Sequence, residues 1–342
     1  MSIGCTKIHM PYLSCMALVE FRKEGFYVPA ADVFIDPLLH VKTAIITHGH
    51  SDHSRAGMGH YICSTLSESI IRHRLGKIKL TTYGYGEQWQ IKGVKFSLIP
   101  AGHIVGSAQV RIEHKGEVWV ISGDYKVEDD GISGTFEPVP CHTFVSESTF
   151  ALPVYTWLDQ KDVFRDINQW WTANRENKVT SILTGYTLGK AQRLLAGLNT
   201  EIGPIFTHGA IESMTQVIRA AGIDLPVTEH INDKTSKEAL KGSLVLAPPS
   251  ATGSSWMKRF GQVSIAAASG WMQVRGTRRR RSVDRGFVLS DHADWQGLND
   301  AIKATGAERI YVTHGYTHVF SKWLASQGYD AGIVETHTRE ET

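Results

Sequence analysis

The chain has 342 residues, of which 42% are hydrophobic and 20% charged, so it can fill two packed cores. Its formal net charge of +2 excludes a protein that attracts nucleic acid through its overall charge, and any such affinity must come from local basic patches. The sequence has no apolar run of transmembrane length and no signal-peptide pattern, and its four cysteines are too scattered for a zinc ribbon or a disulfide framework, so we expect a cytoplasmic protein with free thiols.

Short strands are predicted over residues 17–21, 26–28 and 32–35, which are rich in β-branched and aromatic residues. The last strand ends at Asp36, because the following Pro37 cannot donate a hydrogen bond to a neighbouring strand. On chemistry alone, Asp36 is equally consistent with the cap of a turn and with a group that supports a nearby site.

The densest chemical signal follows at residues 47–54, THGHSDHS, directly after a run of β-branched residues. That run predicts a buried strand, so the cluster lies where a strand ends and a loop begins. His48, His50 and His53 supply imidazoles and Asp52 a carboxylate, the donors that suit Zn²⁺ and similar divalent ions. A polar loop with incidental histidines is the alternative, but the spacing HxHxDH favours a metal site.

Two more candidates come directly after predicted strands. His103 follows the strand 94–99 beside a glycine, where it can point into a site, although a single histidine in such a place is more often structural. Asp124 follows the strong strand 117–121. A carboxylate just past a buried strand lies where open α/β sheets place functional groups.

These motifs, in this order, resemble those of the metallo-β-lactamase superfamily. The resemblance implies that Asp36 orients the metal-binding histidines. The residues implied to hold a first metal ion are His48, His50 and His103. Asp52 and His53 are implied to belong to a second ion, and Asp124 is implied to bridge both.

The rest of the chain resembles the β-CASP nucleases within that superfamily. Glu147 ends a predicted strand and is followed by a small residue and a threonine, as in the first β-CASP motif. His292 follows Ser-Asp after the predicted strand 287–289, and His314 precedes a glycine after the strand 310–313, as in the later motifs. The resemblance covers essentially the whole chain and implies two divalent ions, Zn²⁺ or Mn²⁺, with His314 as a further ligand.

The resemblance also implies catalytic roles. Cleavage of a phosphodiester requires a proton for the leaving oxygen, and an imidazole can supply it near neutral pH. We assign this role to His292, kept protonated by the carboxylate of Glu147. Asp52 and Asp124 are counted as catalytic because the ions that they hold are implied to activate a shared water.

A second α/β region is predicted from residue 153, with a helix over 161–174 and a strand over 179–184. Lys190, beside a glycine at the start of a short helix, is equally consistent with phosphate binding and with an ordinary helix start. A basic run follows Trp271, and its arginines are Arg275, Arg278, Arg279, Arg280 and Arg281. A solvated loop is the usual interpretation of such a run, but its place beside the implied active site favours a surface that tracks nucleic acid.

These observations together predict the fold class and its division. We expect an α/β protein in which residues 1–152 and 283–342 form one metallo-β-lactamase αββα sandwich. Residues 153–282 are expected to form an inserted α/β β-CASP cap domain. The reason is that the implied metal ligands occur near both ends of the chain and are missing from its middle.

Within the β-CASP group, the chain most resembles bacterial DNA-ligase-associated DNA exonucleases, through Ile-Asp-Pro near its start, an arginine run after Ser-Gly-Trp-Met, and Ser-Asp-His-Ala-Asp-Trp. The resemblance implies a DNA exonuclease of repair or end processing, with DNA as substrate and a DNA ligase or helicase as partner. A β-CASP ribonuclease is the alternative, because RNA-cleaving members keep the histidine found at His314. A small-molecule metallohydrolase of glyoxalase or lactonase type would need neither the inserted region nor Glu147 and His292, and a non-catalytic scaffold would have lost metal ligands.

Overall fold

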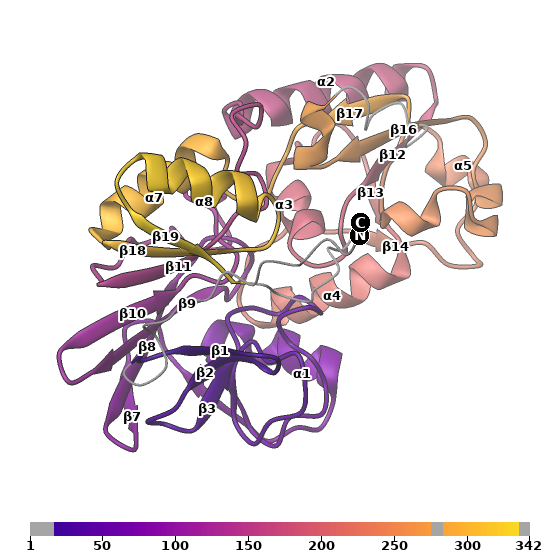
Figure 1. Ribbon diagram of the computed structural model, residues 1–342. Coiled ribbons are helices and arrows are strands. Elements are labelled where there is room, and N and C mark those ends of the chain that lie inside the picture. The colour runs from indigo at the N-terminus through magenta and orange to yellow at the C-terminus, as the bar shows by residue number, and fades with distance from the viewer. Residues whose placement is uncertain (1–16, 275–282, 335–342) are drawn as a thin grey trace, which may run out of the picture.

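A computed structural model describes residues 17–274 and 283–334 of the chain. Within these residues the strands form three sheets, each flanked by helices (Figure 1). The α/β class predicted from the sequence is confirmed. No helix in the described ranges combines the length and the apolar character that a membrane span requires.

The first sheet is built entirely from the N-terminal part of the chain, in the order β1-β2-β3-β4-β5-β6. Its strands are β1 Glu20–Arg22, β2 Gly25–Val28, β3 Val33–Ile35, β4 Ala44–Ile45, β5 Tyr61–Ser64 and β6 Leu80–Tyr83. The first three are antiparallel, and β3 to β6 are parallel. The parallel half directs the ends of β3 and β4 to one edge, where the histidine cluster begins.

The second sheet joins segments from the two ends of the chain, in the order β19-β18-β11-β10-β9-β8-β7. Its strands are β7 Gln88–Ile91, β8 Val94–Pro100, β9 Ala108–His114, β10 Glu117–Ile121, β11 Thr143–Glu147, β18 Arg309–Thr313 and β19 Asp330–Ile333. β18 pairs with β11 in parallel, so that Glu147 lies opposite Thr313. This pairing brings the segment that carries His314 beside the segment that carries Glu147.

The first two sheets pack face to face. One continuous apolar cluster contains Ile35 and Ile45 of the first sheet and Val110 and Ile121 of the second, all almost fully buried. Burying an isoleucine or valine side chain contributes about 1.5–3 kcal/mol relative to leaving it exposed. This shared core holds the edges of the two sheets in register at the histidine cluster.

Helices cover the outer faces of both sheets (Figure 1). α1, Glu68–Leu75, packs Ile71 against Ile46 behind the first sheet. α7, Trp295–Thr305, and α8, Thr317–Ser326, cover the second sheet, where Leu298 and Phe320 pack with Phe144. Both of the packed sheets therefore have helices on their outer faces.

The third sheet is parallel throughout, in the order β14-β13-β15-β12-β16-β17. Its strands are β12 Thr180–Thr184, β13 Ile205–Thr207, β14 Glu229–His230, β15 Leu244–Ala247, β16 Val263–Ala268 and β17 Arg285–Phe287. β12 and β15 are buried along their whole length, as expected for parallel strands covered on both faces. The sequence predicted that this region ends at residue 282. β17 begins after that boundary but pairs with β16, so the chain leaves this sheet only after Phe287.

Helices around the third sheet are α2 Gln160–Glu176, α3 Lys190–Gly197, α4 Gly209–Ala220 and α5 Lys237–Leu240. Short 3₁₀ turns are η1 Thr65–Ser67, η2 Pro249–Ala251, η3 Ser255–Arg259 and η4 Gly270–Gln273. α2 buries Val163, Ile167, Trp170 and Trp171 on one face, as its sequence period predicts. One apolar cluster joins this region to α1 and to the segment after β8, because Leu188 and Leu194 pack with Ile70 and Ile104.

Candidate metal centre

The loop after β4 is held in place by α1. The Arg74 guanidinium donates to the carbonyl oxygen of Gly49 at 2.5 Å and to the hydroxyl of Ser54. Gly49 itself lies so close to α1 that a Cβ there would be 2.7 Å from Ile70 Cγ2. The loop that carries the clustered histidines is therefore fixed by packing and by hydrogen bonds at both of its ends.

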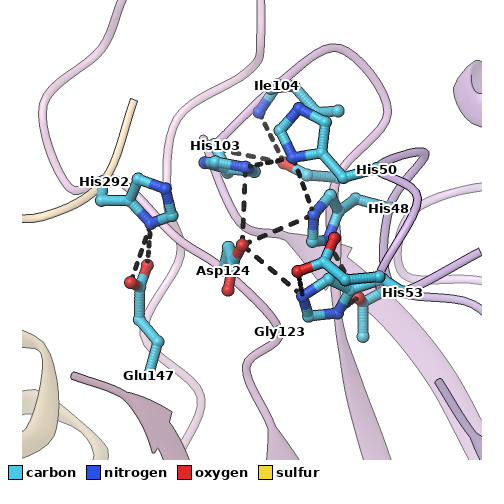
Figure 2. Close-up of polar contacts among 12 residues, drawn as sticks. His48, His50, His53, His103, Ile104, Gly123, Asp124, Glu147 and His292 are labelled. Carbon is cyan, nitrogen blue, oxygen red and sulfur yellow. Dashed lines mark hydrogen bonds and ion pairs between the residues drawn. The ribbon is translucent and has the colours of Figure 1, made fainter. Parts of the chain in front are cut away.

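Three imidazole nitrogens converge with one carboxylate oxygen at this loop (Figure 2). His50 Nδ1 is 3.2 Å from His48 Nε2 and 3.1 Å from His103 Nε2. Asp124 Oδ2 is 3.6 Å from the first of these Nε2 atoms and 3.7 Å from the second. Tetrahedral ligands about 2.0–2.1 Å from a zinc ion lie about 3.3–3.4 Å apart, so this donor set fits a divalent metal.

A second group lies next to the first. Ligand atoms of Asp52, His53 and His314 all lie within 4.8 Å of one another. His53 Nε2 is 3.6 Å from both Asp52 Oδ2 and Asp124 Oδ2, and it is buried without a hydrogen-bond partner in the described structure. A buried nitrogen without a partner is the atom that a metal ion would satisfy. Asp124 Oδ2 lies beside both groups, where a bridging carboxylate would lie.

Asp36 holds the second group from behind. Its Oδ2 accepts from His53 Nδ1 at 2.7 Å and from the Thr47 hydroxyl at 2.6 Å, and its Oδ1 accepts from the Thr47 backbone N–H at 2.8 Å. These bonds direct His53 Nε2 away from Asp36 and toward Asp52 and Asp124. The position agrees with the supporting role that the sequence resemblance implied for Asp36.

Burial and neighbouring carboxylates shift the pKa values of the clustered histidines. Burial lowers the pKa of His48 and His103 well below the usual value, which keeps both neutral, as metal ligation requires. Burial also acts to lower the pKa of His53, but the carboxylates of Asp124, Asp36 and Asp52 outweigh it and raise that pKa to about 10. A divalent cation among these carboxylates would displace the proton from His53.

Two residues of the cluster have left-handed backbones that are unusual outside glycine. Asp36 has φ 44° and His314 has φ 55°. Such conformations cost about 1–3 kcal/mol each and persist where the surroundings require them, which is common at functional sites. Both follow strand ends, and both direct a side chain into the second group of ligands.

His292, which is half-buried, and Glu147, which is fully buried, form a pair beside the candidate ligands. His292 Nδ1 donates to Glu147 Oε2 at 2.8 Å (Figure 2). Glu147 Oε1 accepts from the Tyr125 backbone N–H at 2.8 Å. Burial acts to lower the pKa of His292, but the Glu147 carboxylate raises it to about 9. The ring lines a cavity of about 110 Å³ together with Asp124 and His314. A protonated imidazole therefore lies next to the candidate metal centre.

A second cavity also reaches the cluster. It has a volume of about 300 Å³ and is lined by Asp52, His53 and His314 together with Phe21 and Arg22. Asp52 and His314 line both cavities. The candidate ligand cluster therefore adjoins both cavities.

Comparison with known proteins agrees with this geometry. No family model matches the sequence. A protein named "Probable DNA ligase" from Opitutus terrae is 29% identical over 314 residues, which cover 91% of this chain and 30% of that protein. An RNase J-like protein from Methanocaldococcus jannaschii is 28% identical over 162 residues, which cover 44% of this chain and 38% of the relative. Endoribonuclease YSH1 from Candida glabrata is 30% identical over 121 residues, which cover 34% of this chain and 15% of that protein.

The chain thus spans 15–38% of the lengths of these curated relatives. The similarity to these relatives and the order of the candidate ligand motifs point to the same family. Together they support a metallo-β-lactamase/β-CASP family for this chain. A crystal structure of a protein of unknown function from Enterococcus faecalis superposes with a TM-score of 0.58, covering 87% of this chain and 80% of that chain at 10% identity. At that identity the likeness shows a shared fold only.

Lys190, which the sequence left equally consistent with phosphate binding and with an ordinary helix start, is paired with a buried carboxylate. Lys190, considered as a phosphate contact, is only 3% exposed, and its Nζ lies 2.8 Å from Asp291 Oδ1. An ammonium paired with a buried carboxylate favours a structural role over phosphate binding. The other residues predicted to contact nucleic acid lie outside the described residues: Arg275, Arg278, Arg279, Arg280 and Arg281.

Sequence reasoning missed several residues that shape the site. Phe150 packs against the Trp271 ring at 4.7 Å and near His292 at 5.9 Å between ring centroids. Trp157 Nε1 donates to the His292 carbonyl at 2.9 Å. Arg74 and these aromatic residues carry no motif signal, because a tryptophan or arginine in a helix or loop usually packs or is solvated.

Proposed function

We propose that this chain is a two-metal nuclease that hydrolyses phosphodiester bonds in DNA, as an exonuclease in DNA repair or end processing. One observation carries the proposal. Two adjoining groups of imidazole and carboxylate ligands meet at Asp124 Oδ2, and the His292–Glu147 pair lies beside them. Hydrolysis of an unreactive diester needs both a metal-activated water and a proton donor, and this arrangement supports both.

The proposed metal ions are Zn²⁺ or Mn²⁺. When bound, such ions supply positive charge to the phosphate and lower the pKa of a water between them. The residues that would hold the first ion are His48, His50, His103 and Asp124. Those that would hold the second are Asp52, His53, His314 and the shared Asp124, with Asp36 fixing His53. Imidazole and carboxylate donors are compatible with both metals.

His292 is the proposed general acid. Its Nδ1 is held by Glu147 at 2.8 Å, which fixes the ring and favours its protonated form. The ring lines the same cavity as Asp124, so a phosphate at the metal ions would place its leaving oxygen near this imidazole. His292 would transfer its proton to that oxygen, while Glu147 stays ionised and keeps the ring in place.

The preference for DNA over RNA rests on the comparisons. The relative that matches 91% of this chain is named a probable DNA ligase, whereas the relatives named as ribonucleases match 34–52% of it. We further propose a cytoplasmic protein that acts with a DNA ligase or a helicase. A β-CASP ribonuclease is the second candidate, because several relatives are named as ribonucleases.

We also propose the family's domain organisation. The first two sheets with α1, α7 and α8 correspond to the αββα sandwich, and the third sheet with its helices corresponds to an inserted β-CASP cap. The support is that the strands after residue 305 pair with β11 while those between 180 and 287 form a separate sheet. This division leaves the ligand cluster at the junction of the two parts.

The test is incubation of the purified chain with end-labelled single-stranded and double-stranded DNA and RNA of one sequence, with Mn²⁺ or Zn²⁺. We expect DNA to be shortened progressively from its end and RNA to be cleaved more slowly. The matched control is Asp124→Asn, which should be inactive on every substrate. Faster cleavage of RNA would favour the ribonuclease, and hydrolysis of lactones or thioesters without cleavage of nucleic acid would contradict both.

A further inference from the structure

We propose that the loop 185–190 of the inserted region is a positioning element of the metal centre, and that the Lys190–Asp291 ion pair locks it there. The proposal rests on the proposed metal centre and adds a role for residues outside its ligand set. It predicts that the first metal site depends on the docking of the inserted region.

Two metal-facing imidazoles are oriented by backbone carbonyls from distant segments. His50 Nε2 donates to the Leu188 carbonyl at 3.2 Å, and His103 Nδ1 donates to the Asp291 carbonyl at 2.8 Å. Each bond places the proton on the outer nitrogen and keeps the inner nitrogen unprotonated, as a metal ligand must be. The inner atoms, His50 Nδ1 and His103 Nε2, are the two that lie 3.1 Å apart.

The two carbonyl-bearing segments are joined to each other by buried charges. Lys190, two residues after Leu188, places Nζ 2.8 Å from Asp291 Oδ1. Arg193 Nη1 lies 3.3 Å from the same oxygen and also donates to the Ser290 carbonyl. Lys190, Arg193 and Asp291 are 3%, 2% and 6% exposed, so water screens this network little. The network therefore ties the loop 185–190 to the segment that also carries His292.

The loop also fits closely between the two histidine-bearing turns. Gly189 has φ +87°, and a Cβ there would lie 2.3 Å from Ile104 Cγ2, next to His103. Leu188 lies against the other turn, since a Cβ on Gly49 would be 3.4 Å from Leu188 Cδ2. The loop is thus in contact with the neighbours of both His50 and His103, and little freedom remains for either carbonyl to move alone.

This arrangement makes a selective prediction about metal affinity. His50 and His103 belong to the first ligand group, whereas Asp52, His53 and His314 form the second without contact from the Leu188 or Asp291 carbonyl in the described hydrogen bonds. Loss of a group that orients ligands typically weakens metal binding by about 10–100-fold. We expect that loss at the first site only.

The experiment measures the two Zn²⁺ dissociation constants by competition with a chromophoric chelator. The variants are Lys190→Met, Asp291→Asn and the double variant, which removes both charges and so leaves no unpaired buried charge from this pair. The control is Glu212→Gln, which disturbs a buried hydrogen-bonded carboxylate in α4 of the same inserted region, bonded to Thr207 and Thr228. We expect one site to weaken about 10–100-fold in the first three variants and neither site to weaken in the control.

The outcomes separate this inference from the proposed function. Unchanged dissociation constants in all three variants, or equal weakening at both sites that Glu212→Gln reproduces, would overturn the positioning role while leaving the metal centre intact. A wild-type chain that binds no zinc would instead contradict the proposed function. If the single variants do not fold, the double variant decides the question through its unfolding temperature, which zinc should raise less than in the wild type. An equal rise would overturn the inference.

Discussion

Each histidine of the first ligand group has one ring nitrogen turned inward and the other bonded to a protein oxygen. For His48 the outer partner is the Thr47 hydroxyl at 3.1 Å, and for His50 and His103 it is a backbone carbonyl. His53 follows the same rule through Asp36. A single hydrogen bond therefore determines which nitrogen of each ring faces inward. Small changes at the outer partners should change the affinity for metal.

The proton donor and the metal ligands can be separated by two substitutions. We expect His292→Ala to keep both metal ions but to lose about 10²–10⁴-fold in DNA cleavage, as is typical for loss of a general acid. Asp124→Ala should lose metal and activity together. Metal analysis and cleavage rates of the two variants provide the check. A His292→Ala protein that loses metal would make His292 a ligand and place the general acid elsewhere.

A second prediction at this scale concerns pH and stability. Burial acts to raise the pKa of Glu212, but hydrogen bonds from Thr207 and Thr228 outweigh it and lower that pKa. A lowered carboxyl pKa contributes stability above the unfolded-state pKa of about 4.3, and this contribution is lost as the pH falls through the folded-state value. We expect Glu212→Gln to cost about 1–3 kcal/mol at pH 7 and much less at pH 3. Denaturant unfolding at both pH values measures it, and a cost that does not depend on pH would contradict the assignment.

At the scale of elements, most of the candidate site residues lie at strand ends of the first two sheets. The loop between β12 of the third sheet and α3 contacts the same site. β4 leads into the His48 loop, β10 into Asp124, β11 into Glu147 and β18 into His314. Gly123, with φ +57°, lets the turn after β10 approach the Thr47 side chain, since a Cβ there would lie 2.7 Å away. The loop before α3 then contributes the Leu188 carbonyl, which accepts from His50 Nε2.

A substitution at Gly189 tests whether the loop before α3 must lie this close to Ile104. We expect Gly189→Ala to displace the loop, because alanine disfavours φ +87° and its Cβ would overlap Ile104. The displacement should weaken the first metal site and slow DNA cleavage while leaving the fold intact. Gly222→Ala is the matched control, since its φ is +94° and a Cβ there meets nothing within 4 Å. Equal effects of the two substitutions would show that backbone strain alone is responsible.

The ligands could be predicted because their signal is local. The residues around His48 lie within one loop, and Asp124, Glu147 and His314 each follow a strand that its sequence reveals. Lys190 was harder to interpret, because its partner Asp291 is 101 residues away and a lysine at a helix start has several uses. The contribution of Leu188 is a backbone carbonyl, which no residue pattern reports. Pairing of β18 with β11 likewise depends on packing between distant segments.

At the scale of the whole molecule, a net charge of +2 leaves nucleic-acid affinity to local features. The run Arg278–Arg281 is the strongest basic segment in the sequence, and it lies outside the described residues. If it contacts the substrate backbone, replacing these four arginines with serine should weaken binding to all sequences about equally. It should also reduce the slope of log affinity against log salt by about 0.7–0.9 for each phosphate that the arginines no longer neutralise.

Binding titrations of single-stranded DNA at several salt concentrations measure this slope, and hydrolysis of bis-p-nitrophenyl phosphate is the control. That small diester is too short to reach beyond the metal centre, so its hydrolysis should be unchanged. Equal losses on both substrates would indicate damage to folding or to metal binding. No change on either would make the run a solvated loop.

The most direct test of the two-metal centre is a titration of metal-free protein with Mn²⁺ or Zn²⁺, in which cleavage of end-labelled DNA is followed as ions are added. Because Asp124 lies beside both ligand groups, each ion should complete part of one reacting site. We expect no cleavage without metal and a rate that reaches its plateau at two ions per chain. Cleavage by the metal-free chain, or no cleavage once two ions are bound, would contradict the two-metal centre.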